Sequence, residues 1–324
     1  MLERRRLIAG LAGSMIVPAT AVRAQTWPSQ PLKLIVPYGP GGASDALGRV
    51  VAEKMTTLLG QQVIVENKAG GNTIIGMDAV AKANPDGNTL LLGSTTMATN
   101  VALGFTQPFD PLKDFRMIST IADIHDLLAV NKDLPVKDYA SFAAWVNAQP
   151  QPVRFACSGI GNQPHLWGEL FRARTKLKME VVGYKGSADA LRDVTAGHVP
   201  VFVDVVMPTG PHVNQGRLTG ICVASPERSP ICPNVPTVVE LGMPDLVGAA
   251  FYGLVVPAGV PDSVAERLNA VCLEVVKDEA VKKKLAGLGL VTTGSTPAAF
   301  LERVKAETEQ WSKVVKENKI KVER

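Results

Sequence analysis

The chain has 324 residues, of which 46% are hydrophobic and 20% are charged. Its net charge of +4 arises mostly from the first 24 residues, which hold four arginines and one glutamate; the remainder carries 30 basic and 29 acidic residues. A nearly neutral chain lacks the basic footprint of a nucleic-acid-binding protein. About 300 residues exceed what one hydrophobic core usually supports, so we expect two lobes.

The N-terminal residues have the pattern of an export signal. A basic cluster at Arg4–Arg6 precedes an apolar run from Leu7 to Val17, and the short side chains of Val22 and Ala24 suit signal peptidase. The apolar run is shorter than the roughly 20 residues that cross a bilayer. We therefore expect a signal peptide of residues 1–24, cleavage after Ala24 and a periplasmic protein. The arginines leave the general secretory and twin-arginine routes both open.

Short apolar runs then alternate with helical periodicity, which is typical of α/β architecture. In the first part of the chain we expect strands at 32–38, 62–67, 89–94 and 116–124 and helices at 44–59 and 74–83. The pattern then restarts, with strands at 127–131, 153–157, 179–184, 199–205 and 218–224 and helices at 166–176 and 188–196. A last part has a strand at 251–256 and long helices at 261–288 and 296–318, each with proline in its first turn.

The restart and the final strand predict how the lobes divide the chain. We expect residues 26–125 and 250–324 to form lobe 1 and residues 126–249 to form lobe 2. The chain would then pass between the lobes twice, near Ile124 and near Ala249, with a central cleft between them.

Two glycine-rich segments share the same expected order of elements: a strand, a loop and the start of a helix. The first is VPYGPGGASD at 36–45 and the second is FACSGIGNQPH at 155–165. Glycine leaves backbone N–H groups accessible, and a helix start has unpaired N–H groups and a positive dipole end. Each loop therefore predicts half of an anion site, one half per lobe.

Neither loop contains arginine, so we expect a carboxylate to be held by backbone N–H groups and by polar side chains. The candidates are Ser44, Ser94, Thr95, Thr96, Ser158 and Asn162.

Three titratable residues have two interpretations each. Asp45 either caps the helix that starts beside it, which we favour, or faces the pocket and orients the loop. His165 begins the helix after the second loop and is either a pocket residue or a surface one. Asp204 ends an otherwise apolar strand, where an unpaired buried carboxylate would be costly, so we expect it in the cleft.

The other site classes fit the sequence poorly. A dinucleotide fingerprint would need glycine where the two loops have Ser44 and Pro164, although Glu66 stands where a ribose-binding acid would. The first loop also lacks the last glycine of a nucleophile elbow. Four histidines and four cysteines show no metal-ligand spacing. We expect no cofactor, no metal and no enzyme activity.

The cysteines lie in a chain bound for a compartment that permits disulfides. Cys222 and Cys232 flank a proline-containing loop, and we predict a disulfide between them; the alternative is that Cys222 is a buried strand residue. Cys157 and Cys272 are expected in the core.

The ordered strings of the mature chain resemble one family. They are LIVPYGPGGASD at 34–45, GQQVIVENKAG at 60–70, ANPDG at 83–87, DPLKDF at 110–115, YKG at 184–186, PNVPT at 233–237 and YGL at 252–254. This order is similar to that of the substrate-binding proteins of tripartite tricarboxylate transporters, the Bug-type receptors. Gly39 and Asn88 depart from the usual proline and aromatic residue.

The resemblance implies a type II periplasmic-binding-protein fold and a function. Such a receptor clamps a small mono-, di- or tricarboxylate between its lobes, partly through ordered waters, and delivers it to a two-subunit membrane permease. We expect a monomer, and a role with a sensor protein stays open. Neither the resemblance nor any spacing identifies the ligand.

The family's site positions fall on four loops and one strand end. They are Tyr38, Gly41, Gly42, Ala43, Ser44, Asp45, Ser94, Thr95, Thr96, Ser158, Gly159, Gly161, Asn162, His165, Tyr184, Lys185, Gly186 and Asp204.

Overall fold

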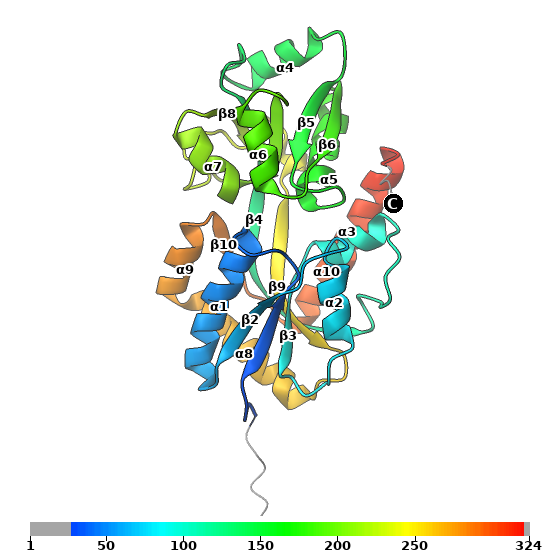
Figure 1. Ribbon diagram of the computed structural model, residues 1–324, viewed down its shortest axis with the longest axis vertical. Coiled ribbons are helices and arrows are strands. Elements are labelled where there is room, and N and C mark those ends of the chain that lie inside the picture. Colours follow the sequence, from blue (N-terminus) through cyan, green and yellow to red (C-terminus); the bar gives the residue numbers. More distant parts are fainter. Residues whose placement is uncertain (1–26, 321–324) are drawn as a thin grey trace, which may run out of the picture.

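The computed structural model describes residues 27–320, and the predicted signal peptide and its cleavage site lie outside them. These residues form an α/β protein of two lobes, drawn one above the other in Figure 1. Two long strands, β4 (Phe115–Asn131) and β9 (Ala249–Pro257), lie side by side where the lobes meet. The predicted fold class, with two lobes and two crossings, is confirmed.

The lower lobe in Figure 1 is a mixed sheet covered by helices on both faces. Its strands follow the order β2-β1-β3-β9-β4. They are β1 (Leu32–Val36), β2 (Val63–Asn67), β3 (Thr89–Ser94), β9 and the first part of β4, which also pairs with β10 (Leu290–Thr292). The helices are α1 (Ala43–Leu59), α2 (Ile74–Ala81), α3 (Thr96–Ala102), α8 (Asp262–Lys277), α9 (Glu279–Ala286) and α10 (Pro297–Glu317).

Alternating side chains of these strands fill two separate cores. Leu34 packs on the face that α1 and α8 cover, whereas its neighbour Ile35 packs on the other face with Met77 of α2 and Phe300 of α10. A nearly continuous apolar strand such as β1 is what a sheet covered on both faces requires.

The upper lobe repeats this arrangement with fewer strands. They are β5 (Val153–Cys157), β6 (Met179–Gly183), β7 (Val201–Val205), β8 (Leu218–Val223) and the second part of β4. The helices are α4 (Tyr139–Asn147), α5 (Gln163–Thr175), α6 (Ser187–Thr195), α7 (Val206–Asn214) and a short 3₁₀ turn at Pro244–Leu246.

The two strands predicted at 116–124 and 127–131 are one strand, β4. Its hydrogen-bond partners change along its length: His125 is paired with Ala249 of β9, and Asp126 with Val205 of β7. The backbone stays extended through this change because almost every residue of β4 is buried. The sheet ladders of the two lobes are therefore joined through β4.

Some predicted helices also need correction. The segment 261–288 is two helices, because Asp278 has an extended backbone and its side chain caps α9 by accepting the Val281 N–H at 3.0 Å. We did not expect α3, α4 or α7. Helix α7 contains Pro208 and Pro211. Pro208 lies in the first turn, where N–H groups have no intrahelical partner, so it costs no hydrogen bond there.

The predicted disulfide is wrong, because all four cysteines are free and buried. Cys222 packs in the upper-lobe core with Leu128 and Phe155. Cys232 packs in a different cluster, with Val206 and Val235. The two thiols face different cores and do not meet.

His125 connects the two passages of the chain between the lobes. Its Nδ1 lies 3.0 Å from the carbonyl oxygen of Ala224 and 2.9 Å from that of Gly248. Both partners can only accept, so Nδ1 carries the hydrogen and donates. The imidazole thereby ties β4 to the segments that follow β8 and precede β9.

We predict that His125→Ala lowers the free energy of unfolding by about 1–3 kcal/mol, because it removes the imidazole donor from the carbonyl groups of Ala224 and Gly248, of which Ala224 keeps the N–H of Gly248 as a second donor. Urea denaturation of the wild type and the variant measures this. His198→Ala is the matched control, since that imidazole is 71% exposed, and we expect it to stay within about 0.5 kcal/mol of the wild type. Equal losses in both variants would contradict the role of His125.

Candidate functional site

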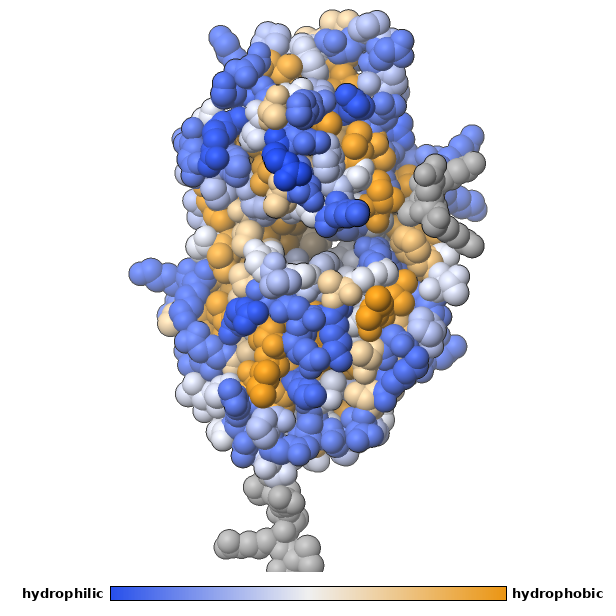
Figure 2. All heavy atoms as spheres, viewed as in Figure 1, coloured by the Kyte–Doolittle hydropathy of each residue, from blue (hydrophilic) through white to orange (hydrophobic). Residues whose placement is uncertain are grey.

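A cavity of about 640 Å³ lies between the lobes and is lined from both of them. The space-filling view shows the hollow at the waist of the molecule (Figure 2). The lower lobe contributes the segments after β1, β2 and β3 and residues of β9, and the upper lobe contributes the segments after β5, β6 and β7. Crevices at the carboxyl ends of strands are where open α/β sheets bind ligands.

The two glycine-rich loops have the same backbone conformation. Gly41 and Gly161 have φ of 86° and 88°, a left-handed conformation that favours glycine. The next residues, Gly42 and Asn162, are the N-caps of α1 and α5, with φ and ψ of −87° and 178° in one and −85° and 175° in the other. The two loops are therefore similar in backbone conformation as well as in sequence.

Each loop is held by the third residue of the helix that follows it. The N–H of Gly41 donates to Oδ2 of Asp45 at 3.0 Å, and the N–H of Gly161 donates to Nδ1 of His165 at 3.0 Å. Asp45 and His165 thus accept the equivalent hydrogen bond in the two lobes. Each hydrogen bond holds its glycine-rich loop against the first turn of the helix that follows.

Asp45 stands behind the first loop and does not line the cavity. It does not cap the helix, since the N-cap is Gly42 without a side-chain bond, so the interpretation that we favoured is wrong. Its carboxylate also accepts from Arg49 Nε at 3.1 Å and Asn67 Nδ2 at 3.0 Å. Burial acts to raise the pKa of Asp45, but the hydrogen bonds of Arg49, Gly41 and Asn67 outweigh it and hold the pKa below its usual range.

His165 likewise lies behind its loop, 2% exposed, and is not among the residues that line the cavity. Burial lowers its pKa to about 4. The ring is therefore neutral at pH 7, as its acceptor role at Nδ1 requires. The pocket role that we considered for His165 is replaced by a role in holding the loop.

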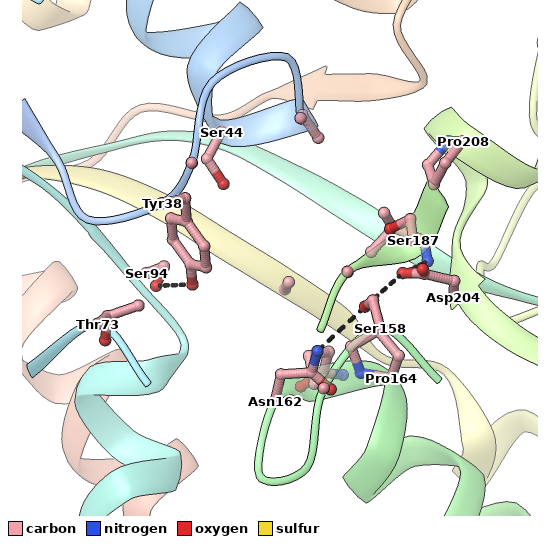
Figure 3. Close-up of a pocket in the computed structure, with 18 of the residues that line it drawn as sticks. Tyr38, Ser44, Thr73, Ser94, Ser158, Asn162, Pro164, Ser187, Asp204 and Pro208 are labelled. Atoms are coloured by element: carbon pink, nitrogen blue, oxygen red, sulfur yellow. Dashed lines mark hydrogen bonds between the residues drawn. The ribbon is translucent and has the colours of Figure 1, made fainter. Parts of the chain in front are cut away.

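A chain of hydroxyl groups forms the lower-lobe wall. Tyr38 Oη lies 2.8 Å from Ser94 Oγ, which lies 2.8 Å from Thr96 Oγ1, which accepts from Thr73 Oγ1 at 2.8 Å. Figure 3 shows Tyr38, Ser94 and Thr73 together on this side. Hydroxyl groups can rotate to donate or accept, so this wall suits a ligand oxygen.

Two neighbouring residues complete that wall. Ser44 of α1 donates to Tyr252 Oη at 3.1 Å. Thr95 Oγ1 accepts from the N–H of Phe251 at 2.9 Å, which ties the end of β3 to β9. The residue Tyr252 enters from the last part of the chain, over 200 residues after Ser44.

The upper-lobe wall carries Ser158, Asn162, Ser187 and Asp204, which Figure 3 shows facing the lower-lobe residues. Tyr184 does not line the cavity, because its hydroxyl donates to Asp193 Oδ2 at 2.8 Å on α6. The residues that follow Tyr184, beginning with Lys185, line the cavity in its place. Lys185 carries the only cationic side chain among the described lining residues.

Asp204 is 1% exposed and also lines the cavity. Its Oδ1 accepts from Ser158 Oγ at 3.1 Å and from the N–H of Val205 at 2.8 Å. Burial raises the pKa of Asp204 to about 6, against the lowering effect of its contacts with Ser187, Val205 and Ser158. Asp126 lies deeper, hydrogen-bonded to Gln163, and burial raises its pKa well above the usual range.

Four helices of eight or more residues begin at this cavity, and the shorter α3 also begins there, with Thr96. First-turn residues of α1, α5, α6 and α7 all line it, represented by Ser44, Pro164, Ser187 and Met207. Each helix start adds a partial positive charge and unpaired N–H groups. Their convergence makes a site for an anion without a cluster of basic side chains.

Fourteen of the predicted site residues line the cavity, and their contact with a ligand stays a prediction. They are Tyr38, Gly41, Gly42, Ala43, Ser44, Ser94, Thr95, Thr96, Ser158, Gly159, Asn162, Lys185, Gly186 and Asp204. Asp45, Gly161, His165 and Tyr184 do not line it. The residues that we missed include Asn72, Thr73, Gln163, Ser187 and Tyr252. The serine after Tyr184-Lys185-Gly186 is the one with a local signal, since it begins a helix.

Residues 27–320 hold neither a set of grouped metal ligands nor a membrane-spanning helix. No group of three or more histidine, cysteine, aspartate or glutamate side chains there is arranged to hold a metal ion. Within the same range, no helix combines the length and apolar character needed to span a membrane.

Residues 47–320 match the family model of the tripartite tricarboxylate transporter family receptor. The chain belongs to this receptor family. It is 35% identical to a protein of Pseudomonas sp. (strain P51) encoded in the tcbD-tcbE intergenic region, over 98% of this chain and 95% of that protein. It is 33% identical to Protein BugT of Bordetella pertussis, over 94% of each.

Solved structures of the same type superpose well on this receptor. A Rhodopseudomonas palustris protein solved with adipate gives a TM-score of 0.84 at 31% identity, over 91% of this chain and 99% of that one. MatC of the same organism, solved with malate, gives 0.79 at 28% identity, over 89% and 99%. Family and neighbours are periplasmic solute-binding receptors, which confirms a periplasmic binding protein and not an enzyme.

The raised pKa of Asp204 predicts how stability depends on pH. Its folded pKa of about 6 exceeds the roughly 4 of an unfolded aspartate, so the native state binds the proton more tightly. Stability from this group is complete below pH 4 and is lost as pH rises through 6. Relative to Asp204→Asn, which does not titrate, the wild type should lose about 2 kcal/mol between pH 4 and pH 8. Denaturant titrations across this range measure it; a constant difference would show that Asp204 is ionised normally.

Proposed function

We propose that this receptor captures a small carboxylate in the cavity between its lobes and delivers it to a two-subunit membrane permease. The observation that carries the proposal is that two matched glycine loops, one from each lobe, and four helix starts meet at a single cavity. A carboxylate is the anion that such N–H groups and hydroxyls hold well, since charge-assisted hydrogen bonds are about twice as strong as neutral ones.

The ligand class is supported by the structural neighbours. The ligands named for the two Rhodopseudomonas palustris structures, adipate and malate, are both small dicarboxylates. A cavity of about 640 Å³ lies within the usual range for small-molecule sites. We infer that the ligand is a mono-, di- or tricarboxylate small enough for this cavity. It would be bound by the fourteen lining residues together with Ser187 and Tyr252, in part through ordered waters.

The proposed lobes are residues 26–125 with 250–324 and residues 126–249. The change of strand partners at His125 and Asp126 and the entry of β9 at Ala249 support these boundaries. Because each lobe holds half of the anion site, a ligand that touches both binds a closed form better than an open one. Moving the lobes from 1:99 to 99:1 closed takes about 5.5 kcal/mol of differential binding.

We predict that Gly42→Val lowers carboxylate affinity at least tenfold and leaves the fold intact. Gly42 has an extended backbone, and a Cβ there would meet no atom within 4 Å, so the added bulk enters the open cavity. Calorimetry with acetate, adipate, malate and citrate measures affinity, and melting temperature measures the fold. Ala280→Val, exposed on α9, is the control. A change below threefold at Gly42 would show that the loop is not the site, and failure of every acid to bind the wild type would refute the proposed function.

Ligand closure should reduce the radius of gyration without turnover. Small-angle scattering of ligand-free and adipate- or malate-saturated protein measures the change, and chromatography of the recovered acid checks that it is chemically unchanged. A larger or equal radius at saturation would contradict the clamp. Steady conversion of the acid would contradict the receptor role.

A further inference from the structure

Two lining residues of the cavity each have a buried polar atom without a hydrogen-bond partner among the described residues, Oε1 of Gln163 and Oδ2 of Asp204. Oδ2 of Asp204 is buried and has no hydrogen-bond partner among the described residues, although the residue lines the cavity. Resting on the proposed function, we propose that Asp204 binds the ligand as a neutral carboxylic acid and donates a hydrogen bond from Oδ2 to the ligand's carboxylate. Each captured carboxylate would then bring one proton from solvent into the cleft.

The hydrogen bonds around Asp204 run in one direction. Asn162 Oδ1 accepts the N–H of His165 at 3.1 Å, which fixes the orientation of that amide. Its Nδ2 therefore faces Ser158 Oγ, at 3.1 Å, and donates to it. The Ser158 hydroxyl, already an acceptor, directs its own hydrogen to Asp204 Oδ1 at 3.1 Å. The chain of donors ends on Oδ1.

The two oxygens of Asp204 are consequently unlike. Oδ1 accepts from Ser158 and from the N–H of Val205, as the carbonyl oxygen of an acid would. Oδ2 has no hydrogen bond among the described residues, although the nearby Ser187 acts to lower the pKa of Asp204, and an ionised oxygen that is buried without a partner is costly. A proton on Oδ2 removes that cost and turns the atom into a hydrogen-bond donor on a residue that lines the cavity (Figure 3).

The charges near Asp204 do not favour its ionised form. No ion pair with Asp204 is found among residues 27–320. The titratable groups that interact with it are Asp126 of β4, Cys157 of β5 and Tyr252 of β9, and Lys185, which precedes α6, lines the same cavity. Lys185 is the one cation that lines the cavity. An arriving carboxylate adds a like charge, which favours protonation of Asp204 further.

The raised pKa of Asp204 supports this assignment, since half of the ligand-free protein would hold the proton near pH 6. If only the neutral form binds, affinity falls about tenfold for each pH unit above 6, which gives about fifty-fold between pH 6 and pH 8. An ionised Asp204 that accepts from a ligand hydroxyl or ammonium would show no such dependence. Adipate, which has neither group, separates the two cases.

Calorimetry of adipate and malate binding in buffers of different ionisation enthalpy tests the proposal. In the wild type we expect uptake of about one proton per acid at pH 7 to 8, and affinity about fifty-fold weaker at pH 8 than at pH 6. Asp204→Asn presents an amide N–H where the neutral acid has its O–H. It should take up no proton, vary less than threefold over the same range and bind more tightly than the wild type at pH 8.

Asp126→Asn is the matched control, because Asp126 is a fully buried carboxyl that, like Asp204, has a raised pKa but does not line the cavity. It should keep the wild-type proton uptake. Three outcomes overturn the proposal while leaving the receptor function intact: carboxylate binding by the wild type without proton uptake, loss of affinity of more than tenfold at every pH in Asp204→Asn, or loss of uptake in Asp126→Asn alone. If no acid binds the wild type, the proposed function fails and this inference fails with it.

Discussion

The hydrogen bond from a left-handed glycine to the third residue of the next helix is the contact on which the site depends. It occurs twice, at Gly41 with Asp45 and at Gly161 with His165, with the same donor and nearly the same φ. In both places it turns the loop so that the helix start is open to the cavity. The acceptors differ in chemistry, but a lowered pKa keeps each in the required state at pH 7: Asp45 ionised and His165 neutral.

The site binds through geometry more than through basic side chains. Four helix starts and a chain of hydroxyls face one cavity, and Lys185 is the one cation among its described lining residues. Fixed backbone dipoles cost little side-chain entropy when a ligand binds, whereas arginine or lysine side chains must be ordered. Such a wall suits the proposed carboxylate ligand without selecting one acid over another.

The lobes are connected by more than the two strands. His125 bonds the carbonyls of Ala224 and Gly248 at the passage between the lobes. On one side of the molecule, Leu166 of α5 packs against Trp311 and Val314 of α10, so the last helix of the lower lobe contacts the upper lobe (Figure 1). A motion of the lobes must therefore pivot about β4 and β9 while this apolar contact adapts.

The sequence alone determined the local elements and the two loops. The strands at 89–94 and 153–157 and the glycine-rich loops were predicted correctly, because apolar periodicity and glycine report the conformation of neighbouring residues. It could not show that β4 is one strand, since His125 and Asp126 interrupt the apolar run while their pairing partners lie far along the chain.

Only the tertiary structure decided which side chains face the cavity. Asp45 and His165 lie on the right helices but turn behind the loops, and Tyr184 turns to Asp193. Tyr252 and Thr73 enter the wall from distant segments. Cys222 and Cys232, close in sequence, point into different cores. Spacing along a chain reports the conformation of a residue, but the direction of its side chain depends on packing between segments that no local pattern records.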